Sequence, residues 1–436
     1  MHNDIKVALK KAILASLPIL HEKEGQLTTP YEVWTKVNEG QWRSKPQKRP
    51  DFHKILTRNR ELLAEAAKGF AALLLTYYPE YGGTVSLVDF GGHRICDSDV
   101  YLLDVALRQL YLRCRTFDCD ETSVDTIVNE FEEFMDQPTV RIRFQAQLQN
   151  YRMTSDNLAL PKNLSIRRLS EEEISTIHTT QGFLRPRLSG PYEFVIEGEI
   201  EVDKRIEGST KKENSFLAAP FHMTQTLLDN AILCLRTFKA GQVGFDYVFF
   251  KPIKFCPIGL YHCLRGDMNP ALGSYRISEE EEIPLREHAV LIFQMNEPAM
   301  ELACRRLADA ETRSQPYDQV IDAVVGMEAL LQGGQEYRFS LRYSTLFNTP
   351  EERYNAFLEA KDLYRIRSKI AHGSNLSDYK WNVGHKKLKL ADAAILAKES
   401  LRNIVRMFLP KTKAAPYKKS EFWERAYFGL TEVKDN

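Results

Sequence analysis

The 436-residue chain lacks the features that define several large classes of protein. Its first residues, MHNDIKVALKK, contain no apolar core of a signal peptide, and its longest apolar runs fall well short of the roughly 18 residues that a membrane span needs. Its seven cysteines include no C-x-x-C pair, so they provide neither a disulfide framework nor a zinc knuckle. The sequence therefore predicts a reduced, cytoplasmic protein without a membrane segment.

Motifs of the common enzyme sites are also missing. The chain has no P-loop, no dinucleotide-binding fingerprint, no G-x-S-x-G and no H-E-x-x-H, and we expect no cofactor and no metal. A net charge of zero removes any global attraction to nucleic acid. The two ends are nevertheless basic, with 12 Lys/Arg against 6 Asp/Glu in residues 1–60 and 13 against 6 in residues 380–436. Such ends can follow a nucleic-acid backbone, although a solvated surface is the commoner reason for them.

Apolar spacing divides the chain into three regions. Residues 1–160 are expected to be mostly helical, with a polar loop at 41–50 and no assigned role. Residues 161–300 are expected to form a mixed α/β domain that senses a trigger or selects RNA. Residues 301–436 are expected to form a helical bundle, because short loops join successive helices there. The predicted fold is therefore mainly α, with a mixed α+β middle region and a C-terminal up-and-down bundle.

Individual elements follow from periodicity. Alternating or aromatic-rich runs predict strands at 81–92, 192–203, 245–255 and 286–293. Helical spacing predicts helices at 99–135, 223–238, 318–331, 337–346, 351–371 and 388–409. The aromatic residues of the last 25 or so positions are expected to dock on the bundle.

One segment combines the side chains of a phosphodiester-cleaving site. Arg365 and Arg367 offer planar cationic forks suited to a phosphate, and His372 brings an imidazole, the side-chain type that can take up and return a proton near neutral pH. Ser368 lies four residues before His372 and shares its helix face. Gly373 is a natural end for this helix.

The combination of this segment with two upstream helices resembles the Apea-like branch of the HEPN superfamily. The matching pieces are YDQVIDAVVGMEALL at 317–331, FSLR at 339–342 and YRIRSKIAHG at 364–373. The resemblance covers roughly the last third of the chain. It implies an all-helical bundle that usually dimerises and places two R-x4-H elements together. Many members of the family are metal-independent ribonucleases of toxin or antiviral (anti-phage) systems.

The resemblance assigns roles to named residues. It implies that Arg367, Ser368 and His372 form the catalytic set, and that Arg365, which also fits the spacing of the motif, assists. The implied activity is that of a hydrolase-class nuclease, an endoribonuclease that cleaves RNA through its own 2′-hydroxyl. The implied partners are RNA, with tRNA among the candidates, a second copy of the chain, and a phage-derived or cellular trigger.

Two supporting residues follow from the need to pair a carboxylate. Glu328 lies on the apolar stripe of helix 318–331, and a buried charge requires a partner. Arg342 or one of the motif arginines is the expected partner, and the pair is either structural or orients the catalytic arginine. Asp318 and Asp322 are expected to act through the charge at the start of their helix.

Two alternatives stay open. The bundle could be a non-catalytic HEPN module for dimerisation or RNA binding. Alternatively, the protein could be a regulator that binds DNA through the basic helices of residues 1–80. This alternative predicts a DNA affinity that falls steeply with salt concentration.

Overall fold

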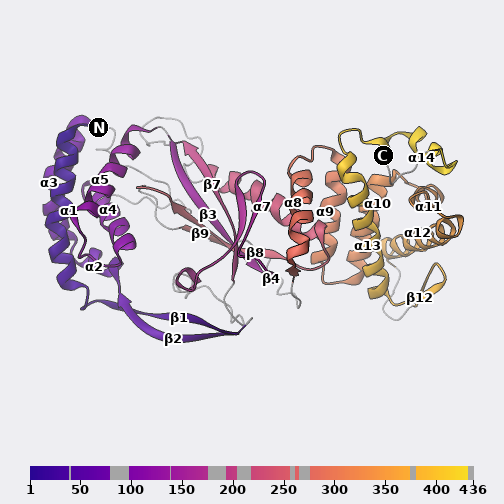
Figure 1. Cartoon of the computed structure of the whole chain (residues 1–436), viewed down its shortest axis with the longest axis horizontal. Coiled ribbons are helices and arrows are strands. Elements are labelled where there is room, and N and C mark those ends of the chain that lie inside the picture. The colour runs from indigo at the N-terminus through magenta and orange to yellow at the C-terminus, as the bar shows by residue number, and fades with distance from the viewer. Residues whose placement is uncertain are drawn as a thin grey trace. The chain divides into compact units, whose positions relative to one another are not determined.

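The computed structural model describes residues 1–38, 41–78, 98–137, 139–174, 193–203, 218–255, 261–264, 275–373 and 380–430. Over these ranges the protein is mainly α with a mixed middle region, as predicted (Figure 1). The strand predicted at 81–92 lies outside the described residues. None of the helices in the described part of the chain is both long and apolar enough to cross a membrane.

The chain forms two compact units whose segments alternate along the sequence. The first unit comprises Met1–Leu148, Asn163–Leu227 and Phe245–Gly266, and the second comprises Gln149–Lys162, Leu228–Gly244 and Asp267–Asn436.

The first unit contains a layer of helices with a shared apolar core. Its helices are α1 (Asn3–Lys23), α2 (Phe52–Arg58), α3 (Arg60–Tyr77), α4 (Ser98–Cys114) and α5 (Glu121–Asp136). The helical region predicted at 99–135 is confirmed and consists of two helices, because the chain breaks between α4 and α5. Arg115 has a φ of 62°, outside the right-handed helical region. Asp120 then starts α5, since its side chain accepts a hydrogen bond of 2.8 Å from the backbone N–H of Ser123.

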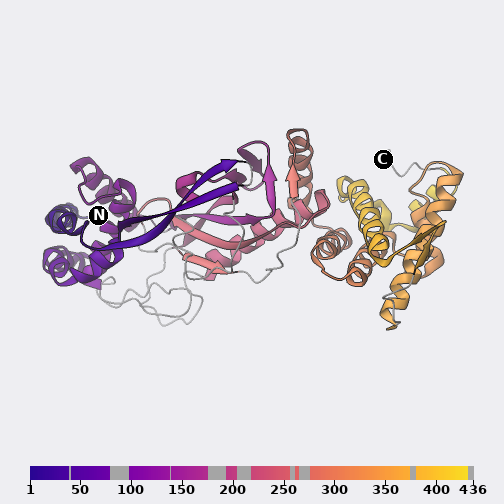
Figure 2. The same cartoon turned by 90° about the horizontal axis from the view of Figure 1, so that it is seen from below.

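Residues 28–38 and 41–50 form an antiparallel two-stranded arm. Its strands are β1 (Thr28–Asn38) and β2 (Gln41–Pro50), so the predicted loop at 41–50 is wrong. That prediction treated Pro46 as a break in regular structure. Proline is tolerated on an edge strand, and each strand of a two-stranded arm has one open edge that needs no N–H donor. Both views show the arm as a long ribbon that leads away from the helical layer (Figures 1 and 2).

A twisted sheet completes the first unit. The strands of the sheet that lie in this unit follow the order β6–β7–β3–β8–β9 and are β3 (Thr139–Gln149), β6 (Leu164–Arg168), β7 (Phe194–Asp203), β8 (Gly244–Pro252) and β9 (Tyr261–Leu264). β7 and β8 confirm the strands predicted at 192–203 and 245–255. β3 begins at Thr139, inside the region that was expected to be mostly helical.

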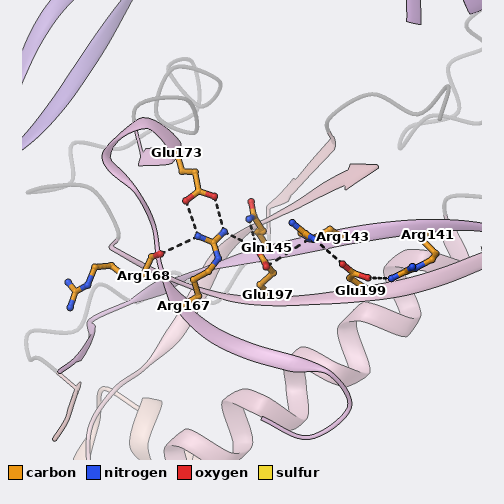
Figure 3. Close-up of polar contacts among 8 residues, drawn as sticks. All are labelled: Arg141, Arg143, Gln145, Arg167, Arg168, Glu173, Glu197 and Glu199. Atoms are coloured by element: carbon orange, nitrogen blue, oxygen red, sulfur yellow. Dashed lines mark hydrogen bonds and ion pairs between the residues drawn. The ribbon is translucent and has the colours of Figure 1, made fainter. Parts of the chain in front are cut away.

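The sheet has one apolar and one charged face. Alternate residues of β3 and β7, such as Phe144 and Ile196, are buried. The residues between them carry charge, and the antiparallel register places Arg143 opposite Glu199, with a separation of 3.0 Å between the charged atoms (Figure 3). From β6, Arg167 reaches Glu197 at 2.8 Å. These side chains neutralise one another, and partly exposed pairs of this kind contribute little to stability.

The second unit begins with short strands and three helices. These elements are β4 (Tyr151–Met153), β5 (Asn157–Leu160), α7 (Ala218–Phe238, shared with the first unit), β10 (Tyr275–Ile277), α8 (Glu279–Phe293) and α9 (Pro298–Thr312). α7 confirms the helix predicted at 223–238. The strand predicted at 286–293 is wrong, because it is the second half of α8. A capping box of Ser278 and Glu281 starts that helix. The buried residues Leu285, Ala289 and Ile292 then repeat at helical spacing.

The four predicted C-terminal helices are confirmed to within two residues at each end. They are α10 (Pro316–Leu331), α11 (Glu336–Ser344), α12 (Pro350–Ala371) and α13 (Leu390–Phe408). α10 contacts α9, α12 and α13, and Gly326 permits the close approach to α13. A Cβ added at Gly326 would lie 2.6 Å from Cδ2 of Leu401. A short hairpin, β11 (Trp381–Val383) and β12 (Lys386–Leu388), that was not predicted separates α12 from α13.

The C-terminal tail docks on α13 through part of its aromatic set. The tail contains the 3₁₀ turns η2 (Leu409–Lys411) and η3 (Pro416–Lys418) and the helix α14 (Ser420–Tyr427). Trp423 is buried, packs 5.9 Å from the ring of Phe408, and donates a hydrogen bond of 2.7 Å to the carbonyl of Tyr417. Tyr427 and Phe428 remain exposed. The predicted docking is therefore confirmed for Trp423 and not for these two.

Asp322 was expected to interact with the charge at the start of α10, and this expectation is wrong. Its side chain is buried and lies 2.7 Å from Nη1 of Arg306 and 3.0 Å from Nε of Arg313. It therefore belongs to a charge network between α9 and α10.

Candidate active site at the end of α12

The R-x4-H segment occupies the last turns of α12, a helix with well-defined ends. At its start, Thr349 and Glu352 form a reciprocal capping box, and Pro350 takes the first helical position. At its end, the N–H of His372 donates a hydrogen bond of 3.1 Å to the carbonyl of Ser368. Gly373 follows with a φ of 74°, a conformation that favours glycine. The helix therefore ends where the sequence predicted.

Arg367 is paired with Glu328 of α10. Nη2 of Arg367 lies 3.2 Å from Oε2 of Glu328, and the guanidinium lies 5.7 Å from the ring centroid of Tyr364. Burial raises the pKa of Glu328, and the nearby charge of Arg367 partly opposes this rise. The partner expected for Glu328 is thus a motif arginine, not Arg342. The Glu328 side chain is 17% exposed and that of Arg367 is 30% exposed, so the pair lies at the edge of the core, within reach of solvent.

The other motif arginine takes different partners. Arg365 is 51% exposed and pairs with Glu336 of α11 at 3.0 Å, with Asp362 3.8 Å away. The two arginines, which the sequence left as alternatives, are therefore distinguished by geometry. Arg367 is anchored on α10, and Arg365 bridges to α11.

Arg342 does not join this group. Its Nη1 donates hydrogen bonds to the carbonyls of Leu331, at 2.7 Å, and Gln332, at 3.2 Å. Its guanidinium also lies 5.4 Å from the ring centroid of Trp423. Arg342 therefore caps the end of α10 and links it to the tail.

The two remaining motif residues are accessible from solvent. His372 is exposed at the end of α12, and Ser368 is half-buried one turn earlier. The end of α12 thus presents an anchored guanidinium, a hydroxyl and an imidazole. These groups can bind a phosphate and transfer a proton. Within the described ranges, no group of three or more His, Cys, Asp or Glu side chains is placed to hold a metal ion.

The β11–β12 hairpin beside α12 was missed by the sequence analysis. The N–H of Gly384, at the turn of the hairpin, donates a hydrogen bond of 3.0 Å to Oδ2 of Asp362 on α12. The signal in the sequence was a lone glycine between two short runs, WNV and KKL. Each run is only three residues long, too short to show alternation.

Comparisons with known proteins found no match to this chain among protein-family models, curated proteins or solved structures. Function is therefore inferred from the residues of α10 and α12 themselves.

Proposed function

We propose that this protein is a metal-independent endoribonuclease of the HEPN type, with Arg367, Ser368 and His372 as its catalytic residues. It acts as a homodimer in the cytoplasm, as a toxin or an anti-phage effector. Its substrate is RNA, and tRNA is one candidate substrate. Its trigger is a phage-derived or cellular component.

The observation that carries this proposal is the ion pair between Arg367 and Glu328. It uses one terminal nitrogen of the guanidinium and holds the side chain beside the end of α12. The other guanidinium N–H groups stay available to a phosphate, because no further hydrogen bond joins them to a described residue. An arginine held in place before substrate arrives stabilises charge that develops in the transition state.

The reaction needs two proton transfers. One imidazole removes the proton of the ribose 2′-hydroxyl while the 2′-oxygen bonds to phosphorus. The bond from phosphorus to the 5′-oxygen then breaks, and a second, protonated imidazole donates its proton to that oxygen. The products are a 2′,3′-cyclic phosphate and a 5′-hydroxyl. Arg367 and the Ser368 hydroxyl bind the phosphoryl oxygens throughout.

The need for a dimer follows from the number of histidines that the reaction uses. Each chain provides one histidine at the motif, His372, whereas the reaction uses one base and one acid. A second copy that placed its own α12 end against the first would supply the missing imidazole. An exposed His372 is compatible with that arrangement.

The test is incubation of the full chain with total cellular RNA in excess chelator, with and without lysate of phage-infected cells to supply a trigger. Product ends are then mapped. His372→Ala is expected to lower the cleavage rate roughly 10²–10⁴-fold, the contribution of a general acid or base. Arg367→Ala is expected to cost roughly 10²–10³-fold, as for other groups that stabilise developing charge.

Two variants serve as matched controls. Arg365→Ala removes the other motif arginine and is expected to cost less than Arg367→Ala. His21→Ala removes an exposed histidine of the first unit and is expected to leave the rate unchanged. Cleavage retained by His372→Ala would refute the mechanism. RNA bound but never cut under any condition would assign the bundle to a non-catalytic role in dimerisation or RNA binding.

A further inference from the structure

The β11–β12 hairpin carries a group of cations beside the end of α12. Residues 380–389, KWNVGHKKLK, contain four lysines and a histidine but no acidic residue. The strands pair Trp381 with Leu388 and Val383 with Lys386. Gly384 makes the turn with a φ of 56°, a conformation that suits glycine at the first position of a two-residue loop.

Both ends of the hairpin are attached to α12. Near the turn, the N–H of Gly384 is bonded to Asp362. At the open end, Trp381 is buried, and Nζ of Lys369 lies 5.2 Å from its ring centroid. Asp362 and Lys369 are separated by about 10 Å along the helix at 1.5 Å per residue. The hairpin therefore runs along α12, with its open end toward His372.

Alternation along the strands separates inward from outward side chains. Trp381 and Val383 are buried, which identifies the face that packs on the protein. Lys386 pairs with Val383 across the strands but its side chain is exposed, and its charge acts on Glu359 of α12 by opposing the rise in pKa that burial causes there.

The opposite face carries Lys380, Lys387 and Lys389. All three are exposed, and none forms an ion pair with a residue in the part of the chain that the structure describes. Lys387 and Lys389 are two positions apart on an extended segment, a separation of about 6.6 Å at 3.3 Å per residue. This separation is close to that of neighbouring phosphates in an RNA strand.

We propose that the outward face of this hairpin, Lys380, Lys387 and Lys389, is a subsite for the RNA backbone. It binds phosphates next to the one held at Arg367, and so it rests on the proposed nuclease function. Lysines act there as point charges that position the strand without reading its bases. Trp381 is buried and offers no ring for a base to stack on. The subsite is therefore expected to bind RNA with little dependence on sequence.

The test measures binding alone, in chelator, by the fluorescence anisotropy of a labelled single-stranded 2′-O-methyl RNA that cannot be cleaved through its 2′-oxygen. Full-length protein carrying Lys387→Gln and Lys389→Gln is compared with the unmodified protein over a series of salt concentrations. Removing two phosphate contacts should reduce the slope of log K against log salt by about 1.4 and weaken binding at 0.1 M salt by about tenfold or more.

The control variant carries Lys413→Gln and Lys419→Gln, which removes two exposed lysines of the same unit. Lys386→Gln tests the lysine of the same strand whose charge is directed at Glu359 of α12. Both are expected to keep the slope of the unmodified protein. Circular dichroism spectra that match across all variants establish that each is folded.

Equal slopes for the Lys387/Lys389 double variant and the unmodified protein would overturn the subsite, as would an unmodified protein that does not bind RNA. A polyglutamate peptide that bound through these lysines when RNA did not would also overturn it, in favour of an acidic protein partner. Failure of the nuclease proposal is seen separately. Lysine-dependent binding, together with no cleavage under any condition in the total-RNA assay, would support the subsite and refute the enzyme.

Discussion

The buried ion pair between Arg402 of α13 and Glu311 of α9 should control the stability of the second unit. Arg402 is 1% exposed and Glu311 is 3% exposed, and their charged atoms are in direct hydrogen-bonding contact. Lys398 lies 3.3 Å from the other carboxylate oxygen of Glu311, and Glu399 also pairs with Arg402. Arg402→Met keeps most of the side-chain volume but removes the principal partner of a buried carboxylate.

The expected cost follows from the burial of the charge that is left behind. Breaking a fully buried pair typically costs about 3–5 kcal/mol, whereas replacing both partners with apolar residues is often neutral. Lys398 still compensates part of the Glu311 charge, so we expect Arg402→Met to destabilise the unit by about 2–4 kcal/mol. The double variant with Glu311→Leu should recover most of this loss, because it leaves no buried carboxylate without a partner; Glu399, which also loses Arg402, is 46% exposed.

The assay is hydrogen exchange of α9 and α13 peptides in increasing urea, which reports on the second unit separately from the first. Arg305→Met is the matched control. Arg305 pairs with Glu301 on the same helix, at 2.8 Å, but both side chains are about half exposed. That variant should cost less than about 1 kcal/mol. A loss below about 1 kcal/mol for Arg402→Met, or a double variant no more stable than the single one, would refute the reasoning.

Two further predictions concern stability, measured by the same hydrogen exchange in urea on peptides of the helix that carries each substitution. Burial, with a smaller effect from the charge of Arg406, lowers the pKa of His288 to about 4. Because the unfolded chain takes up a proton below about pH 6.5 and the folded chain does not, stability should fall between pH 6.5 and 4, by up to about 1.4 kcal/mol per pH unit. His288→Gln should flatten this slope, and an unchanged slope would contradict the assignment. Gly326→Ala should destabilise α10 by up to about 2 kcal/mol, since crowding against Leu401 outweighs the better helix propensity of alanine. Gly69→Ala in α3, where an added Cβ meets open space, should instead stabilise its helix by about 0.5–1 kcal/mol, and equal effects at the two sites would refute the packing argument.

Some parts of this fold can be predicted from the sequence and others cannot, for a physical reason. The C-terminal helices were predicted closely because each is long, periodic and bounded by residues that start or end helices. Thr349 and Gly373 mark the two ends of α12 in this way. The errors at 41–50 and 286–293 came from short segments. A local pattern does not distinguish a proline in an open-edged strand from a proline in a loop, or an apolar run inside a helix from a buried strand. These cases differ only in what packs around the segment.

For the candidate site, the sequence determined the R-x4-H spacing, the helix that carries it and the need for a partner at Glu328, because all three depend on residues near one another in the chain. Only the tertiary structure decided that this partner is Arg367 and that Arg342 instead caps α10. It also decided that three hairpin lysines face outward beside α12. Each of these outcomes depends on how elements distant in sequence pack, and helical periodicity identifies the buried face of a helix without identifying its neighbour.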